Sequence, residues 1–261
     1  MDLELSGRVV LVTGGVRGVG AGISSVLTGL GATVIACARR PADDPDSTPY
    51  TEFVSCDIRD AEAVAAMLDD IISRHGALDA VVNNAGGSPF ALAADASPRF
   101  HSKIVELNLL APLVVAQAAH RIMLGQERGG SIVNVSSLSG HRPSPGTAAY
   151  GAAKAGLDSL TGSLAVEWAP RVRVNSVVVG AVQTELAELH YGDEEGIAAV
   201  GRTIPMGRMA LPADVGNAVA FLISPLAEYV TGSTVAVHGG GERLAFLDAA
   251  TADNSVHAPT S

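Results

Sequence analysis

The sequence Thr-Gly-Gly-Val-Arg-Gly-Val-Gly, residues 13–20, lies between a short apolar run at 9–12 and a segment of helical pattern at 18–30. Its glycines lack a Cβ atom, so the backbone there can turn sharply and approach a ligand closely. A helix that begins directly after such a turn presents N–H groups without intrahelical partners, and these groups bind phosphate well. The stretch therefore indicates a dinucleotide-binding site, although a glycine-rich turn also occurs without a ligand.

Apolar runs continue to alternate with segments of helical length along the rest of the chain. The runs are rich in Val and Ile, as in parallel strands that are covered on both faces. The expected strands are residues 9–12, 33–37, 53–55, 80–82, 131–135, 172–177 and 234–237. The expected helices are residues 18–30, 61–75, 97–124, 148–168 and 212–222. This order predicts a single-domain α/β fold: a Rossmann-type, doubly wound sheet of about seven parallel strands with helices on both faces.

Composition excludes several other classes of protein. Of the 261 residues, 48% are hydrophobic and 17% are charged, which excludes a disordered chain. The net charge of −10 argues against a nucleic-acid partner, because phosphates attract Lys and Arg. Two cysteines, Cys37 and Cys56, are too few for a disulfide framework, and the histidines show no metal-ligand spacing. We expect a small-molecule substrate and no metal.

The termini and the long insert give the expected domain organisation. The first residues lack the features of a secretory signal, and the longest weakly polar stretch, 109–119, is shorter than a membrane span. We therefore expect a cytoplasmic protein without a membrane span. Residues 1–244 form the expected dinucleotide-binding and catalytic domain, and residues 245–261 form a C-terminal tail. Residues 185–208 interrupt the alternation, as is typical of a substrate loop.

Further motifs follow the glycine turn in a fixed order along the chain. Asp57 follows the third expected strand, and Asn-Asn-Ala-Gly at 83–86 follows the fourth. Ser137 follows the fifth, and the motif with Tyr150 and Lys154 opens a later helix. Each of these motifs is weak alone, but the ordered set is specific.

Together with Thr13 and the G-x-x-x-G-x-G spacing of the turn, this set resembles the short-chain dehydrogenase/reductase family. The resemblance covers about residues 5–244, and residues near 205–215 resemble its 3-oxoacyl thioester reductases. It implies an oxidoreductase that interconverts a ketone and a secondary alcohol by hydride transfer. It also implies a homo-oligomer, a tetramer or a dimer. The expected helices 97–124 and 148–168 agree with that, because they are apolar on more than one face.

Tyr150 and Lys154 are four residues apart, so both side chains lie on one face of the expected helix. A free phenol has a pKa of about 10, and a nearby ammonium stabilises the phenolate. We therefore expect Lys154 to lower the pKa of Tyr150, which then acts as the general acid and base. In isolation, the same spacing also describes a surface pair on an amphipathic helix.

Two more residues complete the expected catalytic set. Ser137 ends the fifth strand and can bond the substrate oxygen; Ser136 has the same chemistry, but strand alternation favours Ser137. The resemblance assigns Asn108 the role of distorting its helix and holding a water in the proton path. The alternative is an ordinary polar residue in a helix. We also expect Ser139, His141 and Leu186 to line the substrate pocket.

The end of the second strand indicates which dinucleotide binds. An acidic residue there would select NAD, but residues 36–40 read Ala-Cys-Ala-Arg-Arg. Arg39 and Arg17 can form charge-assisted hydrogen bonds with a 2′-phosphate. The sequence therefore predicts NADP(H) as the cofactor, with NAD(H) as the alternative. The resemblance also has Asp57 accept from the adenine amino group. The alternative role for Asp57 is a helix N-cap, for which Asp60 is better placed.

The resemblance places a larger set of residues against the cofactor. These are Gly14, Arg17, Gly18, Val19, Gly20, Arg39, Asp57, Ile58, Asn84, Ala85, Gly86, Tyr150, Lys154, Gly180, Val182 and Thr184. Two positions depart from the family pattern. Val179 stands where proline is usual, and His238 stands where an acidic residue is usual.

The substrate loop is mostly apolar, which predicts a 3-oxoacyl thioester, a steroid-like ketone or another lipid-like carbonyl compound. The alternative function is a catalytically silent, dinucleotide-binding redox sensor or scaffold. Such proteins tend to lack the Tyr–Lys pair, which this chain retains.

Overall fold

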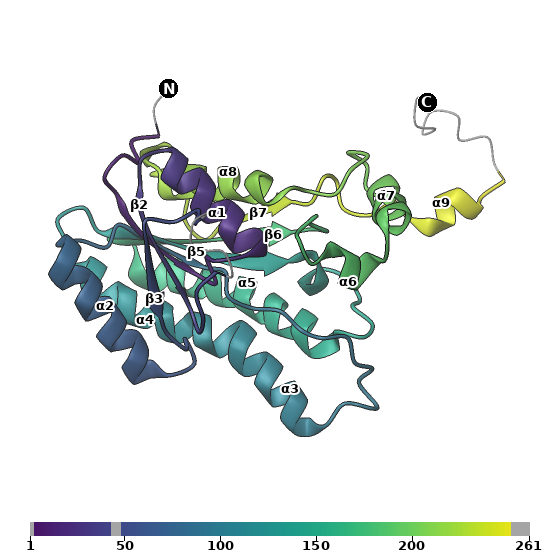
Figure 1. Cartoon of the computed structure of the whole chain (residues 1–261), viewed down its shortest axis with the longest axis horizontal. Coiled ribbons are helices and arrows are strands. Elements are labelled where there is room, and N and C mark those ends of the chain that lie inside the picture. Colours follow the sequence, from purple (N-terminus) through teal and green to yellow (C-terminus); the bar gives the residue numbers. More distant parts are fainter. Residues whose placement is uncertain (1–2, 43–47, 252–261) are drawn as a thin grey trace.

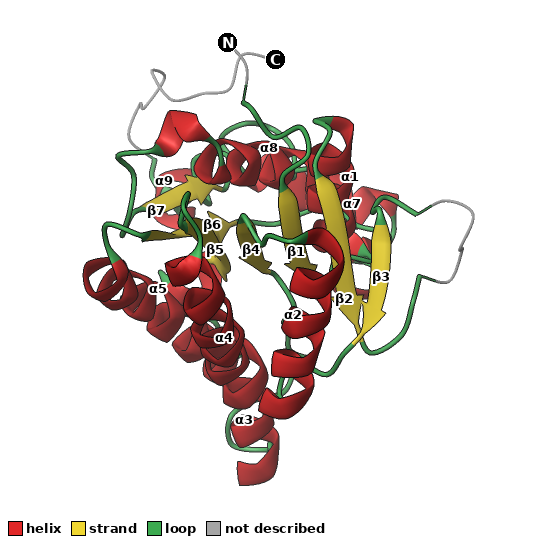
Figure 2. Cartoon of the chain, turned by 90° about the vertical axis from the view of Figure 1, so that its left-hand side faces the viewer, coloured by secondary structure: helices red, strands yellow, loops and turns green. Residues whose placement is uncertain are grey.

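The computed structural model describes residues 3–42 and 48–251 of the chain. Its described residues form one parallel sheet in the order β3-β2-β1-β4-β5-β6-β7 (Figure 2). The strands are β1 (Val9–Thr13), β2 (Thr33–Ala38), β3 (Glu52–Ser55), β4 (Ala80–Asn83), β5 (Gly130–Ser137), β6 (Val172–Val179) and β7 (Thr234–Val237). The strand order reverses between β1 and β4, and ligands bind at the carboxyl ends of the strands at such a point.

Helices cover both faces of the sheet, which confirms the expected Rossmann-type architecture. They are α1 (Gly18–Gly29), α2 (Ala61–His75), α3 (Pro98–Val105), α4 (Ala111–Gly125), α5 (Ala148–Trp168), α6 (Ala187–Tyr191), α7 (Glu194–Thr203), α8 (Pro212–Ile223) and α9 (Ala245–Ala249). Short helices also occur at Leu138–Gly140 and Pro225–Ala227. The expected tail begins with α9, and residues 252–261 lie outside the described part of the chain.

Alternate strand residues build two separate cores. On one face, Leu11 and Ile35 pack with buried side chains of α2, α4 and α5. On the other face, Val10 and Val34 pack with buried side chains of α1 and α8. Because both faces are covered, both sets of side chains along a central strand are mostly apolar, and the buried polar ones, such as Ser136 and Ser176, have hydrogen-bond partners.

The expected helix at 97–124 is divided into three parts. Between α3 and α4, residues Glu106–Leu110 form a π-helix, in which the backbone hydrogen bonds span one residue more than in an α-helix. The helical run begins at Pro98, directly after Ser97, whose hydroxyl accepts a hydrogen bond from the N–H of Phe100. The π-helix places Asn108 inside the molecule, where it is fully buried.

This run is longer than the apolar stretch on which the expectation about membrane spans was based. Residues Pro98–Gly125 form 28 continuous helical residues, which is long and apolar enough to cross a membrane by length and composition. The sequence estimate was too short because it counted only the weakly polar stretch 109–119. Helix α4 is a core helix here, packed on β4 and β5, and a core helix passes the same test.

The insert at 185–208 contains α6 and α7 and is attached to the fold before and after them. Val182 and Ala210 form an isolated parallel bridge. The Gln183 N–H donates to the Ala210 carbonyl at 2.8 Å, and the Ala210 N–H donates to the Ala181 carbonyl at 3.0 Å. Figure 1 shows α6 and α7 together at one end of the molecule, beyond the strands. We refer to residues 183–209 as the insert loop.

Directly after the insert loop, α8 is held against α1 by a close backbone contact. A Cβ atom on Gly22 would lie 2.2 Å from the Cβ of Pro212, the first residue of α8. Real Cβ atoms do not approach so closely, so glycine is required at this crossing. The glycine turn and the end of the insert loop are therefore fixed to one another.

Candidate active site

Hydrogen bonds join the glycine turn at the carboxyl end of β1 to the end of β4. The Thr13 hydroxyl accepts from the N–H groups of Asn84 and Ala85 at 2.9 and 3.0 Å. The Asn84 amide donates to the Thr13 carbonyl at 2.9 Å. A Cβ on Gly20 would lie 2.1 Å from the Gly14 carbonyl oxygen, so the turn closes tightly only with glycine.

The first turn of α1 already binds a negative charge. The Gly18 N–H donates to the Glu185 carboxylate, at 2.9 Å to Oε1 and 3.2 Å to Oε2. An anion is favoured here because the helix dipole and the unpartnered N–H groups both attract it. Thr184 is adjacent, with its Cγ2 3.7 Å from the position of a Gly18 Cβ. The carboxylate shows that this helix end fits an anionic group such as a pyrophosphate. The sequence reading did not identify Glu185.

The expected adenosine end of the site contains an ion pair that the sequence reading missed. Both oxygens of Asp57 bind Arg59, at 2.9 Å to Nε and 2.5 Å to Nη2. This hydrogen bonding, with help from the Arg39 charge, holds the pKa of Asp57 at about 2. The N-cap of α2 is Asp60, as expected, and it accepts from two N–H groups of the first turn.

The two arginines expected at a 2′-phosphate are both exposed. Arg39 directly follows β2, and Arg17 directly precedes α1. Neither forms an ion pair with another residue in the ranges 3–42 and 48–251. Their guanidinium groups therefore remain available to a ligand.

The other residues of the expected cofactor set follow the strand ends. Ile58 is buried in the core beside α2, and Val19 packs on the opposite core, so their side chains serve packing. A Cβ on Gly86 would lie 2.6 Å from Asn108 Oδ1, so the chain passes close to that amide. Gly180 follows β6, and its N–H donates to the Val237 carbonyl at 3.1 Å.

Val179 and His238, the two residues that depart from the family pattern, lie at the ends of β6 and β7. Val179 is buried and is the last residue of β6, in register with Ser137 and Val237. The chain therefore continues the sheet where proline would end it. His238 packs against Gly180, and its Nδ1 is buried without a hydrogen-bond partner within the described residues.

The catalytic residues converge at the carboxyl end of β5. Ser137 is its last residue, and its hydroxyl forms a hydrogen bond with Tyr150 of α5. One turn later, the Lys154 side chain is buried, and its Nζ lies 5.7 Å from the centroid of the Tyr150 ring. The same Nζ donates to the Val135 carbonyl at 2.7 Å.

The expected pKa of Tyr150 needs correction. Burial raises it, and the hydrogen bond with Ser137 only partly opposes that effect. Burial also lowers the pKa of Lys154 to about 8. The expectation assumed a well-charged lysine directed at the phenol, but in this structure its Nζ bonds the Val135 carbonyl, and burial disfavours the charged form of both groups.

Asn108 lies at the centre of the π-helix, and its side chain forms hydrogen bonds with α3 and with the segment after β4. Its amide donates to the Ile104 carbonyl at 2.9 Å and to the Gly87 carbonyl at 3.0 Å. Its Oδ1 accepts from the Gly87 N–H at 2.8 Å. The side chain thus joins the distorted helix to the segment after β4.

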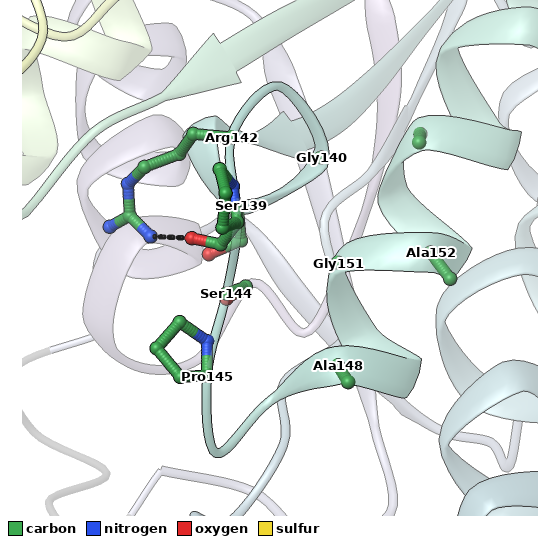
Figure 3. A pocket seen from close by; sticks show the side chains of 10 residues that line it. Ser139, Gly140, Arg142, Ser144, Pro145, Ala148, Gly151 and Ala152 are labelled. Atoms are coloured by element: carbon green, nitrogen blue, oxygen red, sulfur yellow. Dashed lines mark hydrogen bonds between the residues drawn. The ribbon is translucent and has the colours of Figure 1, made fainter. Parts of the chain in front are cut away.

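The expected substrate residues do not share one cavity. Ser139 lines a hollow of about 530 Å³ that also includes Arg142, Ser144 and Pro145 (Figure 3). Ala148, Ala152 and Ala155 form its α5 wall, about half a turn around the helix from Tyr150. This hollow is therefore not the catalytic cleft.

The other two expected substrate residues have different environments. His141 binds Asp158 on α5, and Leu186 is exposed before α6. Tyr191 of α6, by contrast, is close enough to affect the pKa of Tyr150. Arg142 and Glu242, which form an ion pair at 2.6 Å, have opposite effects on the pKa of Tyr191: Arg142 lowers it and Glu242 raises it. The end of α6 therefore borders the reacting groups.

The described part of the chain holds neither a metal-ligand cluster nor an exposed thiol. The described residues contain no group of three or more His, Cys, Asp or Glu side chains that could hold a metal ion. Cys37 and Cys56 are buried and free, and burial raises the pKa of Cys37 to about 12. Neither thiol is therefore placed as a nucleophile.

Comparison with known proteins defines the class. Residues 14–242 match a family model described as enoyl-(acyl carrier protein) reductase. The 3-oxoacyl-[acyl-carrier-protein] reductase FabG of Vibrio cholerae is 36% identical over 243 residues, covering 91% of this chain and 98% of that protein. The 3beta-hydroxysteroid dehydrogenase 1 of Eggerthella lenta is 34% identical, covering 91% of this chain and 94% of that protein.

A solved structure agrees with these sequence relatives. Ligand-free aldohexose dehydrogenase of Thermoplasma acidophilum superposes with a TM-score of 0.86 at 30% identity, over 100% of this chain and 99% of that one. Fold, motif order and relatives define an NAD(P)-type oxidoreductase that acts on CH–OH or C=O groups. The chain belongs to the short-chain dehydrogenase/reductase family.

Proposed function

We propose that this protein is an NADP(H)-dependent oxidoreductase that interconverts an apolar ketone and a secondary alcohol, with Tyr150 as general acid and base. The observation that carries the proposal is the convergence of Ser137, Tyr150 and Lys154 at the carboxyl edge of the sheet. This edge adjoins a helix N-terminus that binds a carboxylate. A redox sensor or scaffold would not need this catalytic geometry.

The residues divide the work of the reduction. A reduced dinucleotide held by the glycine turn and residues 84–86 would supply the hydride for the carbonyl carbon. Tyr150 donates its phenolic proton to the carbonyl oxygen, and Ser137 donates a hydrogen bond to the same oxygen. Lys154 holds positive charge beside the phenolate that results, and Asn108 holds a water through which the proton is replaced. Alcohol oxidation runs the same steps in reverse.

In the proposed complex, the Glu185 carboxylate has to leave the N-terminus of α1 before the cofactor binds there. We propose that the pyrophosphate replaces the Glu185 carboxylate at the Gly18 N–H, because one helix end cannot hold both charges. The remaining cofactor contacts come from the glycine turn, from residues 84–86 and from the Gly180–Thr184 segment. Residues 1–244 then act as one catalytic domain with the substrate loop at 185–208.

The substrate class follows from the insert loop. Leu186 and Leu189 are exposed there, so the loop offers apolar contact surface to a ligand. We propose a 3-oxoacyl thioester, a steroid-like ketone or another lipid-like carbonyl compound, and relatives named for the first two support this range.

A panel of carbonyl compounds tests the proposed function. Purified protein is mixed with NADPH and, in turn, the acetoacetyl thioester of N-acetylcysteamine, a 3-ketosteroid and a ketose. We expect the absorbance of reduced nicotinamide to fall with the thioester or the steroid and to change little with the ketose. Tight cofactor binding without consumption in any mixture would instead support the sensor or scaffold.

The preference for NADP(H) rests on Arg17 and Arg39. Both are exposed and border the expected adenosine end, and no acidic residue stands at the end of β2 to accept from ribose hydroxyls. Two guanidinium groups in this position stabilise a 2′-phosphate by charge-assisted hydrogen bonds.

Arg39→Ala should weaken NADPH binding by about 10- to 100-fold, the value of one or two hydrogen bonds to a charged group. NADH affinity should change by less than about threefold, because NADH lacks the 2′-phosphate. Fluorescence titration measures both constants, and the neighbouring Arg40→Ala is the matched control. An equal loss for both dinucleotides would reject Arg39 as a phosphate ligand.

We also propose a cytoplasmic homo-oligomer, a tetramer or a dimer. Leu124 at the end of α4 and Val166 near the end of α5 are exposed, Val166 by 82%. Helices with apolar side chains on their outer faces need cover beyond their own sheet. In a symmetric homo-oligomer, the same apolar surface of a second copy of the chain supplies this cover.

A further inference from the structure

One turn beyond Lys154 on α5, Asp158 places a carboxylate in the layer between the helix and the sheet. Its side chain is only 11% exposed. The Ser136 hydroxyl donates to Oδ2 at 2.7 Å, and the Ser176 hydroxyl donates to Oδ1 at 2.5 Å. His141 Nε2 lies 2.9 Å from Oδ2, and it donates to that oxygen in the tautomer that carries its proton on Nε2. Both oxygens of the carboxylate are therefore fixed.

Such an arrangement holds the Asp158 carboxylate in one orientation. A buried carboxylate is costly unless donors replace its lost hydration, and here three side chains do so. The serines come from two neighbouring strands, β5 and β6, and His141 comes from the turn after β5. Because each donor is held by a different element, the negative charge has a fixed position.

Asp158 follows Lys154 by four residues on α5, so the two side chains leave the same face of the helix one turn apart. Lys154 is 3% exposed, and burial lowers its pKa to about 8. Asp158 opposes that effect of burial and raises the pKa of Lys154. Without an opposing charge, a buried lysine loses its proton at a still lower pH.

The other ionisable groups around α5 do not take this role. Tyr150 and Tyr191 have raised pKa values and are neutral near pH 7. Lys103 and Glu106, where α3 meets the π-helix, pair with each other at 2.5 Å on the exposed side. On α4, His120 stacks on Trp168 at the far end of α5.

We infer that Asp158, held by Ser136, Ser176 and His141, is the counter-charge that keeps Lys154 protonated in its buried position. Asp158 is thereby a positioning residue, which acts on the reaction through Lys154. Its role in catalysis depends on the proposed function. It touches neither the reacting atoms nor the dinucleotide site.

The sign of the pH effect follows directly. Lys154 is charged below its pKa and loses its charge as the pH rises through that value. Removing the Asp158 charge moves this loss to lower pH. The alkaline limb of the activity profile should then move in the same direction.

The composition makes the test simple, because Lys103 and Lys154 are the only lysines in the sequence. Full-length protein with ¹³Cε-labelled lysine gives two side-chain signals, whose shifts are followed by NMR over about pH 6–11. In Asp158→Asn, we expect the protonation constant of Lys154 to fall at least tenfold, and that of exposed Lys103 to stay constant. Asp158→Glu should restore most of the difference.

A matched control removes another carboxylate from the same helix. Glu167→Gln lies about 20 Å along α5 from Lys154, so the titration of Lys154 should not change. An unchanged Lys154 titration in Asp158→Asn overturns the inference. If that variant does not fold, the unmodified chain decides instead: a Lys154 already neutral at pH 7 also overturns it, and a Lys154 still charged there supports it.

The experiment separates this inference from the proposed function. The NMR titration needs neither substrate nor turnover, so it measures the counter-charge alone. A lowered Lys154 titration in a protein that reduces no ketone would reject the proposed function and keep the electrostatic role. In an active enzyme, the alkaline limb of kcat/KM should fall at lower pH in Asp158→Asn, while Glu167→Gln keeps the original profile.

Discussion

Tyr150→Phe is expected to lower the turnover of ketone reduction by about 10²- to 10⁴-fold. Phenylalanine keeps the ring in its half-buried position but removes the hydroxyl that bonds Ser137. No proton then reaches the substrate oxygen from the protein. Steady-state NADPH oxidation measures the loss, with the most active compound of the carbonyl panel as substrate.

Dinucleotide affinity is the control for this variant. Tyr150 belongs to the expected cofactor set, but phenylalanine retains its ring, so the dissociation constant for NADPH should change by less than about fivefold, worth roughly 1 kcal/mol. Turnover that stays within a few-fold of the original enzyme would show that another group supplies the proton. The proposed mechanism would then be wrong, while the family assignment would stand.

Gly20→Ala is expected to damage both stability and cofactor binding. The new Cβ would lie 2.1 Å from the Gly14 carbonyl oxygen and 2.5 Å from Asn84 Nδ2. The turn has to open to relieve these contacts, which costs about 1–3 kcal/mol in the free energy of unfolding. We expect NADPH affinity to fall more than tenfold as well. Urea unfolding and fluorescence titration measure the two effects.

Gly29→Ala is the matched control, because it makes the same chemical change at the end of the same helix. A Cβ at that position meets no atom within 4 Å. Alanine there should leave affinity unchanged and stabilise the chain by up to about 1 kcal/mol. Equal effects from the two substitutions would mean that the close contact at the turn is unimportant.

Much of the fold was predictable because burial leaves a clear signal in the strands. Central strands such as β1 and β4 are covered on both faces, so their residues are apolar without alternation. The break at Glu106–Leu110 left no such signal. It depends on the Asn108 amide reaching Gly87, a contact between segments far apart in the sequence, and helical periodicity carries no information about it.

The site was predictable where motifs end strands, because the carboxyl ends of parallel strands meet at one edge. This is why Ser137 and Tyr150 could be placed together. The partners of Lys154 and Gly18 were not predictable, since Asp158 and Glu185 belong to no motif. The pKa of Tyr150 was predicted in the wrong direction because the sequence shows the nearby cation but not the depth of burial.

The attachment of the insert loop has a mechanical consequence. The bridge between Val182 and Ala210 and the contact of Pro212 with Gly22 hold both ends of the loop still. The span between them is joined to α1 through the Glu185 carboxylate, a bond that an incoming phosphate can replace in kind. The second half of the loop is fixed as well, because the Met206 N–H donates to the Gly239 carbonyl at 3.1 Å and the Arg243 N–H donates to the Thr203 carbonyl at 2.8 Å. A phosphate that displaces Glu185 therefore releases only the first half of the loop, around α6, and neither hydrophobic core has to move to admit a large ligand.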